Sequence, residues 1–160
     1  MNAYVKGLSA TDYDNDGDVD MFISNFGGNN QLIKNLLTET GELKFTDVTQ
    51  AAGVTNPKDS FSCMFFDYNN DGHLDFYVTN FGSNVLYRNT GDGTFTDVTR
   101  EAGVDDPRFS ASAAFLDYDF DGDLDLYVTN YVSFTVKGNR ECGEARRDYC
   151  SPSVYDPLPD

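Results

Sequence analysis

Three short stretches of the chain carry aspartate at a spacing that could bind a metal ion. They read DYDNDGDVD (12–20), DYNNDGHLD (67–75) and DYDFDGDLD (117–125), each with a single glycine. They hold five, three and five of the 27 acidic residues, which is nearly half of the total. Carboxylates this close repel one another unless a cation lies among them or water solvates them fully. Each stretch is therefore a candidate cation site.

Acidic or amide side chains recur at positions 1, 3, 5 and 9 of each stretch, and glycine occupies position 6. Oxygen ligands at alternate positions can wrap a hard cation, and glycine permits the turn by which position 7 offers its backbone carbonyl. The spacing predicts about three calcium ions, one per loop. In each loop, four residues are predicted to bind through side-chain oxygens, and the residue at position 7 through its backbone carbonyl. The predicted ligands are Asp12, Asp14, Asp16, Asp18 and Asp20 in the first loop; Asp67, Asn69, Asp71, His73 and Asp75 in the second; and Asp117, Asp119, Asp121, Asp123 and Asp125 in the third.

These loops differ from the helix-flanked EF-hand. An EF-hand loop needs a bidentate glutamate at position 12, where this chain has Ile23, Val78 and Val128. The spacing instead indicates a shorter calcium loop that joins two strands. A solvated aspartate and glycine turn without metal is the alternative, and three copies of the same spacing disfavour it.

Two further expectations concern side chains inside the loops. The apolar residue at position 8 (Val19, Leu74 or Leu124) is expected to point into the sheet and anchor the end of the loop. His73 is the only histidine, and at position 7 its side chain is expected to point outward into solvent. A Ser/His/Asp arrangement for nucleophilic catalysis is therefore not expected.

The elements that must position these loops repeat along the chain. The segment 12–29 returns at 67–84 and, in shorter form, at 117–130, and FTDVTQAAGV (45–54) returns as FTDVTREAGV (95–104). A repeat of about 50 residues is typical of propeller blades or solenoid turns. We divide a single segment, 1–160, into repeats at about 1–55, 56–105 and 106–160.

Each repeat has the composition of β structure. FSCMFF (61–66) and ASAAFL (111–116) precede the loops, DFYVTN (75–80) and DLYVTN (125–130) follow them, and NVLYRN (84–89) and TFTDVT (94–99) flank a glycine-rich turn. The predicted fold class is all-β, with β-propeller blades formed as four-stranded antiparallel meanders. The chain should contain two full blades and a partial third, and a β-solenoid is the weaker alternative.

The overall composition limits the partners. The 160 residues are 39% hydrophobic, which suffices for a core, and the formal net charge is -16. Nucleic acid is not an expected partner, because 11 basic residues offer no face to match phosphates. The sequence shows neither a transmembrane run nor a signal-peptide core at its start.

The three cysteines fall into two kinds. Cys63 lies in a predicted buried strand, so a free structural thiol is expected. Cys142 and Cys150 lie in an insertion over 131–160 that has no counterpart in the earlier repeats. We predict a disulfide between them and hence an oxidising compartment, with two unpaired loop thiols as the alternative.

The quoted loops, together with DFYVTNFGSNVLYRNTGDGTFTDVTREAGV (75–104) and RRDYCSPSVYDPLPD (146–160), resemble the FG-GAP/VCBS calcium repeats of integrin-α-type propellers. Within that family the chain is most similar to the cartilage acidic protein and ASPIC/UnbV group. The resemblance implies a secreted, cell-surface or periplasmic propeller of seven-bladed type. The remaining blades are expected in a longer parent chain.

The sequence therefore predicts a calcium-binding β-propeller segment that serves as an extracellular structural or adhesion module, with a protein, matrix or carbohydrate partner. The alternative is part of a carbohydrate-active enzyme such as a polysaccharide lyase. Every close carboxylate pair is already assigned to a metal loop, so we expect no catalytic residues and no enzyme activity.

Overall fold

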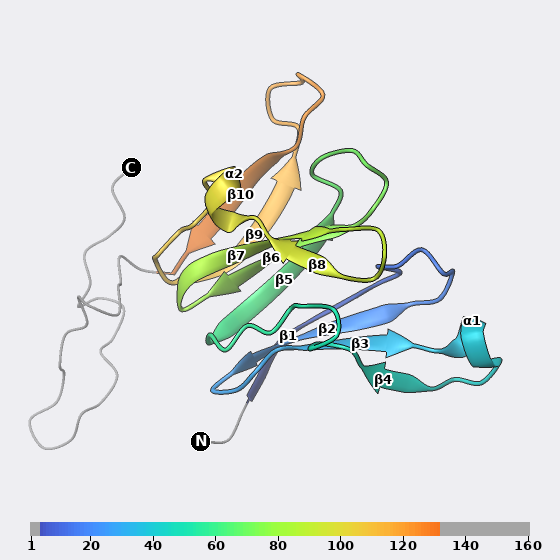
Figure 1. Ribbon diagram of the computed structural model, residues 1–160. Coiled ribbons are helices and arrows are strands. Elements are labelled where there is room, and N and C mark those ends of the chain that lie inside the picture. Colours follow the sequence, from blue (N-terminus) through green and yellow to red (C-terminus); the bar gives the residue numbers. More distant parts are fainter. Residues whose placement is uncertain (1–3, 132–160) are drawn as a thin grey trace, which may run out of the picture.

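The computed structural model describes residues 4–131, which form three antiparallel sheets arranged as a fan (Figure 1). The first sheet contains β1 (Tyr4–Thr11), β2 (Asp20–Phe26), β3 (Gln31–Asn35) and β4 (Phe45–Asp47). The second contains β5 (Ser60–Phe66), β6 (Asp75–Asn80), β7 (Gly82–Asn89) and β8 (Phe95–Asp97). The third contains β9 (Ser110–Leu116) and β10 (Asp125–Asn130).

The strand order within each four-stranded sheet follows the sequence, as expected for a meander. The prediction of an all-β fold with two full blades and a partial third is therefore confirmed. Two helical turns, α1 (Leu37–Thr40) and α2 (Thr99–Ala102), are the helices in the described part of the chain. Neither is long or apolar enough to cross a membrane. Cys142, Cys150 and the predicted insertion lie outside the described residues.

The core lies between the sheets, where each blade covers one face of the next. Phe76 of β6 is fully buried, and its ring centroid lies 4.9 Å from those of Phe22, Tyr87 and Phe95. Phe22 belongs to the first sheet, so this aromatic cluster joins two blades. A second cluster joins the second blade to the partial third, because Phe66 of β5 stacks on Phe115 of β9.

Small residues on β1 allow the first two blades to approach closely. A Cβ atom at Gly7 would lie 2.7 Å from the backbone oxygen of Phe61, so β1 leaves no room for a side chain there. Ser9 donates a hydrogen bond to the carbonyl of Cys63, which is itself buried and free. The expected buried thiol is confirmed, and burial raises its pKa above the usual range.

A buried polar chain also crosses each joint between blades. At the first joint, Asn30 Nδ2 donates to Ser60 Oγ at 2.8 Å, and Ser60 Oγ donates to Asn80 Oδ1 at 2.6 Å. The same two bonds recur at the second joint, at 2.8 and 2.9 Å, between Asn84, Ser110 and Asn130. Buried polar groups are costly unless they are paired, so each of these bonds helps to fix the register between blades.

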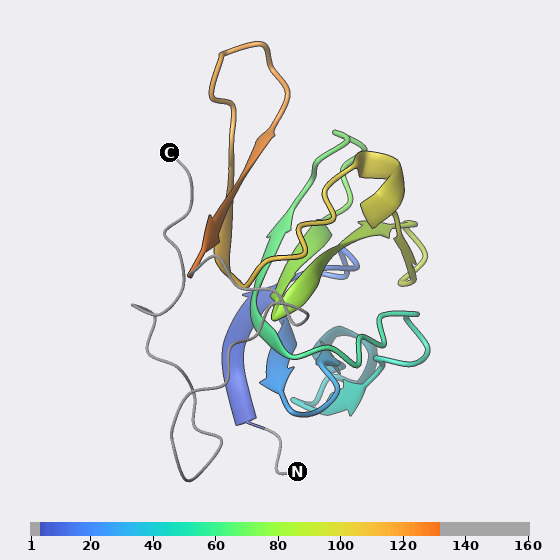
Figure 2. The same ribbon diagram turned by 90° about the vertical axis from the view of Figure 1, so that its left-hand side faces the viewer.

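The two outermost sheets each leave an apolar face in contact with solvent among the described residues. On β1, Tyr4, Val5 and Leu8 are each more than 60% exposed. On β10, Tyr127 is 66% exposed, and the β9–β10 hairpin extends beyond the four-stranded sheets (Figure 2). The middle blade, in contrast, has a β6 strand that is buried along its whole length.

Candidate metal centre

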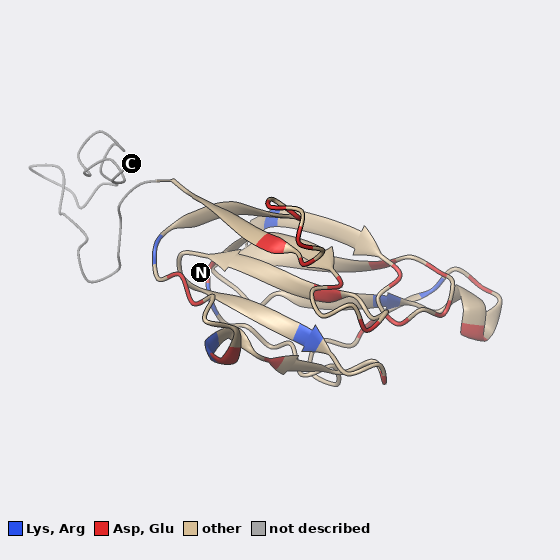
Figure 3. Cartoon of the chain, turned by 90° about the horizontal axis from the view of Figure 1, so that it is seen from above, with Lys and Arg blue, Asp and Glu red and all other residues tan. Residues whose placement is uncertain are grey.

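The three aspartate loops occupy equivalent places in the fold. Each joins the first strand of its sheet to the second: β1 to β2, β5 to β6, and β9 to β10. In Figure 3, which colours the chain by residue type, acidic residues recur along the loops, whereas lysine and arginine residues are few. The repeated spacing in the sequence therefore corresponds to a repeated place at one end of the blades.

Left-handed backbone conformations produce the tight turn. The glycine at position 6 has a positive φ in every loop, between 85° and 96°, which favours glycine because no Cβ clashes. Position 4 is also left-handed, with φ of 59° at Asn15, 56° at Asn70 and 62° at Phe120. Asparagine tolerates this region better than phenylalanine does, so the third loop carries the greater backbone cost.

The aspartate at position 1 organises the turn through backbone N–H groups. Asp12 accepts from the amides of Asp16 and Gly17 at 3.1 and 2.9 Å. Asp67 repeats both bonds in the second loop, at 3.1 and 2.8 Å, and Asp117 accepts from the amide of Gly122 at 3.2 Å. The loop conformation is therefore set largely by its own aspartates.

Position 9 ties the loop to the sheet. Asp20 is 1% exposed and accepts from the amides of Tyr13 and Asn35, at 3.3 and 2.8 Å. Asp75 is fully buried and accepts from the corresponding amides of Tyr68 and Asn89, at 3.1 and 2.7 Å. Burial raises the pKa of each of these two carboxyl groups to about 6, because it disfavours the charged form.

The carboxylates at positions 1, 3 and 9 converge in the first and third loops. Their ligand oxygens lie within 4.8 Å of one another in two groups: Asp12, Asp14 and Asp20, and Asp117, Asp119 and Asp125. The second loop has Asn69 at position 3, so its oxygens would come from two carboxylates and an amide. In the first loop, Asp16 and Asp18 form a separate group with Glu39.

The donor set fits a hard divalent cation. Asp14 Oδ1 and Asp117 Oδ1 are buried and have no hydrogen-bond partner, which is costly for a carboxylate. Calcium takes six to eight oxygen ligands, including carboxylates and backbone carbonyls. A bound calcium ion would be held by the converging carboxylates and would pair these oxygens. The assignment of individual ligands stays a prediction.

The expectation for position 8 was wrong. Val19 is 56% exposed and Leu124 is 39% exposed, and Leu74 is half-buried. In a strand, neighbouring side chains point to opposite faces. Because Asp20 at position 9 points inward with Phe22, the preceding residue must point outward.

His73 is half-buried, not freely solvated as expected. Its Nδ1 lies 3.5 Å from Asn15 Nδ2 of the first loop, and Asn15 Nδ2 lies 3.3 Å from the carbonyl oxygen of Gly72. The first two loops therefore touch each other across the joint between blades.

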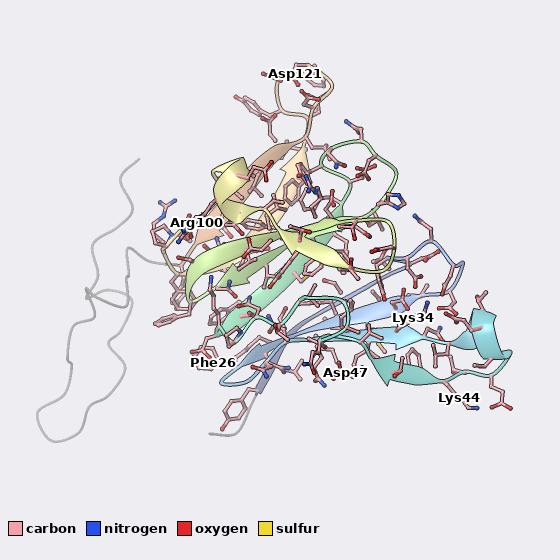
Figure 4. All side chains as sticks on the ribbon, in the orientation of Figure 1. Phe26, Lys34, Lys44, Asp47, Arg100 and Asp121 are labelled. Atoms are coloured by element: carbon pink, nitrogen blue, oxygen red, sulfur yellow. The ribbon has the colours of Figure 1, made fainter. Side chains whose placement is uncertain are left out.

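Two residues beside the first loop were not found from the sequence. Lys34 Nζ of β3 lies 2.5 Å from Asp14, 3.1 Å from Asp16 and 2.6 Å from Glu39 at α1 (Figure 4). Partial burial opposes protonation, but the hydrogen bonds to these acids raise the pKa of Lys34 above its usual range. Lys34 is thus a fixed cation beside the loop. Only the alignment of IKN (33–35) with YRN (87–89) hinted at a basic residue here.

Repeated antiparallel blades with an acidic loop between the first two strands define a β-propeller type of repeat protein. The sequence matches the FG-GAP-like repeat family over residues 12–78 and 67–128, and the chain belongs to that family. Each matched stretch begins at the first aspartate of a loop. No curated protein matches the chain closely enough to count as a relative.

Proposed function

We propose that the protein is a calcium-binding FG-GAP propeller module, of the cartilage acidic protein and ASPIC/UnbV type, that mediates structural or adhesive contacts outside the cell. The observation that carries the proposal is the convergence of positions 1, 3 and 9 with a buried, unpaired carboxylate oxygen in two loops. Family membership supports the propeller and the extracellular setting. The narrower group rests on the resemblance of the quoted motifs.

Calcium is expected to stabilise the fold because it binds the folded loops and relieves their repulsion. Three ions would bring six positive charges to a chain whose formal charge is -16. A ligand that binds only the native state stabilises it by about 2.7 kcal/mol at a hundredfold excess over its Kd. Calorimetry of the full chain with and without millimolar calcium measures this shift. An unchanged melting temperature would overturn the proposal.

Loop substitutions test where the ions bind. Asp14→Ala and Asp119→Ala should each remove one calcium equivalent in equilibrium dialysis, because each deletes a converging carboxylate. Asp105→Ala is the matched control, since it removes the same charge from an exposed position outside the loops. A loss of calcium in the control equal to that in the loop variants would indicate diffuse charge binding instead of discrete sites.

The adhesive role predicts binding without turnover. A panel of immobilised matrix proteins and glycans, probed with and without calcium, should contain calcium-dependent binders. Acidic polysaccharides should not be cleaved, because the convergent carboxylates are used as ligands and as structural acceptors. Cleavage of a polysaccharide would favour the alternative, a propeller that belongs to a lyase.

A further inference from the structure

The first two aspartate loops are connected through the joint between their blades. Asn89, at the end of β7 in the second blade, is 3% exposed and contacts both loops. Its Nδ2 donates to the carbonyl of Tyr13 in the first loop at 2.9 Å and to the carbonyl of Leu74 in the second at 3.1 Å. One buried side chain therefore bridges position 2 of the first loop and position 8 of the second.

The bridge is part of a longer hydrogen-bonded path between two predicted ligands. The Tyr13 amide donates to Asp20 Oδ2 at 3.3 Å, and the Asn89 amide donates to Asp75 Oδ1 at 2.7 Å. Asp20 and Asp75 occupy position 9 of their loops and are 1% and 0% exposed. The path therefore runs from one buried carboxylate to the other through Tyr13 and Asn89. Hydrogen bonds in such a buried chain strengthen one another.

Comparison of the two blades separates the bonds within a blade from the bond between blades. Asn35 of β3 is the equivalent residue in the first blade. Its amide donates to Asp20 Oδ1 at 2.8 Å, and its Nδ2 donates to the carbonyl of Val19 at 3.4 Å. Each blade therefore uses an asparagine to hold its own loop. Of these two asparagines, Asn89 is the one that, within residues 4–131, also donates to the loop of a neighbouring blade.

Two further contacts hold the first loop against the second blade. Tyr13 is 2% exposed, and its ring centroid lies 5.6 Å from that of Phe95 in β8. Asn15 Nδ2 lies 3.3 Å from the carbonyl oxygen of Gly72 in the second loop. The conformation of the first loop therefore depends on where the second blade holds its own loop and the end of β7.

Binding in one loop should order groups that the other loop needs. Calcium bound by the second loop would fix Asp75 and, through it, the end of β7 that carries Asn89. Asn89 would in turn fix the carbonyl of Tyr13. The first loop would then lose less conformational entropy on binding its own ion, so its affinity would rise. Coupling of binding free energies is reciprocal, so an ion in the first loop would raise the affinity of the second by the same factor.

Charge acts in the opposite direction. The second loop has three acids, so one bound calcium ion reduces its charge from three negative charges to one. A filled second loop therefore attracts a cation to the first loop less strongly than an empty one does. If an ion in one loop raises the affinity of the other, the contacts between the blades must be the cause.

We infer that Asn89 couples calcium binding in the first two loops, so that an ion in either loop raises the affinity of the other. This inference rests on the proposed calcium function. Asn89 is a positioning residue, because it is not a predicted ligand and acts through the carbonyl of Tyr13 and the carboxylate of Asp75.

Amide chemical shifts of the full chain, followed during a titration with calcium chloride, report each loop separately. Gly17 and Gly72, at position 6 of the first and second loops, are the probes. Asp71→Ala removes an exposed predicted ligand of the second loop that lies outside the path, and it should raise the calcium midpoint at Gly17 by at least about fivefold. Asp14→Ala should raise the midpoint at Gly72 by the same factor, because the coupling is reciprocal.

Asn89→Ala tests the bridge itself, because it deletes the Nδ2 donor and keeps the backbone amide. In this background, Asp71→Ala should change the midpoint at Gly17 by less than about twofold. Asn35→Ala is the matched control, since it deletes the equivalent side chain of the first blade, which is 6% exposed, and keeps the bridge between the loops. Both asparagine variants should weaken calcium binding, but the fivefold effect should persist in Asn35→Ala.

The outcomes separate this inference from the proposed function. If Asp71→Ala left the midpoint at Gly17 unchanged or lowered it, the coupling would be overturned, and calcium binding itself would stand. That comparison does not use Asn89→Ala, so it decides the inference even if this variant fails to fold. Coupling that survives in a folded Asn89→Ala variant would overturn the role of Asn89. A wild-type chain whose amides did not respond to calcium would overturn both the inference and the proposed function.

Discussion

The polar chain at the second joint between blades can be tested by replacing Asn84 with alanine. Asn84 is 1% exposed, accepts from the Asn80 amide at 2.8 Å and donates to Ser110 Oγ at 2.8 Å. The substitution leaves the buried Asn80 N–H without this acceptor, which costs about 1–3 kcal/mol. Ser110 loses the hydrogen bond from Asn84 but keeps its own bond to Asn130, so this part of the destabilisation is smaller, at about 1 kcal/mol.

The expected destabilisation of Asn84→Ala is therefore about 2–4 kcal/mol in the free energy of unfolding. For a chain of this size it corresponds to a fall in melting temperature of roughly 5–15 °C. Urea denaturation at a fixed calcium concentration measures the free energy directly. Asn29→Ala is the control, because Asn29 is exposed and an exposed substitution should change stability by about 0.5 kcal/mol or less.

A double-mutant cycle shows whether the loss arises at the joint. Ser110→Ala removes the other half of the bond, so the double variant should lose less stability than the sum of the two single variants. Additive effects would show that Asn84 and Ser110 act independently. An Asn84→Ala variant within about 0.5 kcal/mol of the Asn29→Ala control would refute the assignment of the polar chain as a stabilising element.

Three other predictions concern packing, thiols and the open faces. Gly7→Ala should lower the free energy of unfolding by about 1–3 kcal/mol, because the added methyl group meets the Phe61 oxygen; an unchanged urea midpoint would contradict this close approach. Cys63 is buried, so it should resist a thiol reagent until the chain unfolds, and rapid labelling of the native protein would disprove this. Mass spectrometry should find Cys142 joined to Cys150 by a disulfide, and free thiols at both residues would disprove that pairing. The exposed faces of β1 and β10 should promote self-association, and a monomer insensitive to dilution in light scattering would count against it.

The local features of the fold were predictable because short-range chemistry determines them. The glycine at position 6 and the aspartate at position 1 form the turn through bonds within the loop, so the spacing alone located all three loops. The strands that flank the loops follow from apolar runs and from the repeat. The exposure of Val19 could also have been predicted from the sequence, because neighbouring side chains of a strand point to opposite faces and Asp20 points inward.

The contacts between repeats could not be found in the same way. Glu39 comes to the first loop through a segment that has no equivalent in the second blade, so comparison of the repeats gives it no counterpart. The bond from Asn30 to Ser60 joins residues 30 positions apart, and each looks like an ordinary turn or strand residue. Such pairs become visible only when the distance between the blades is known.

The three loops share a sequence pattern but not an environment, and this difference should rank their calcium affinities. Tyr13 in the first loop is 2% exposed, and its carbonyl accepts from Asn89 of the second blade at 2.9 Å. Tyr118, its equivalent in the third loop, is 77% exposed, and Asp125 is exposed as well. A loop already held in its bound shape loses less conformational entropy on binding. Calcium should therefore leave the third loop first, because the neighbouring strands and blade, more than the ligand residues, hold each loop in place.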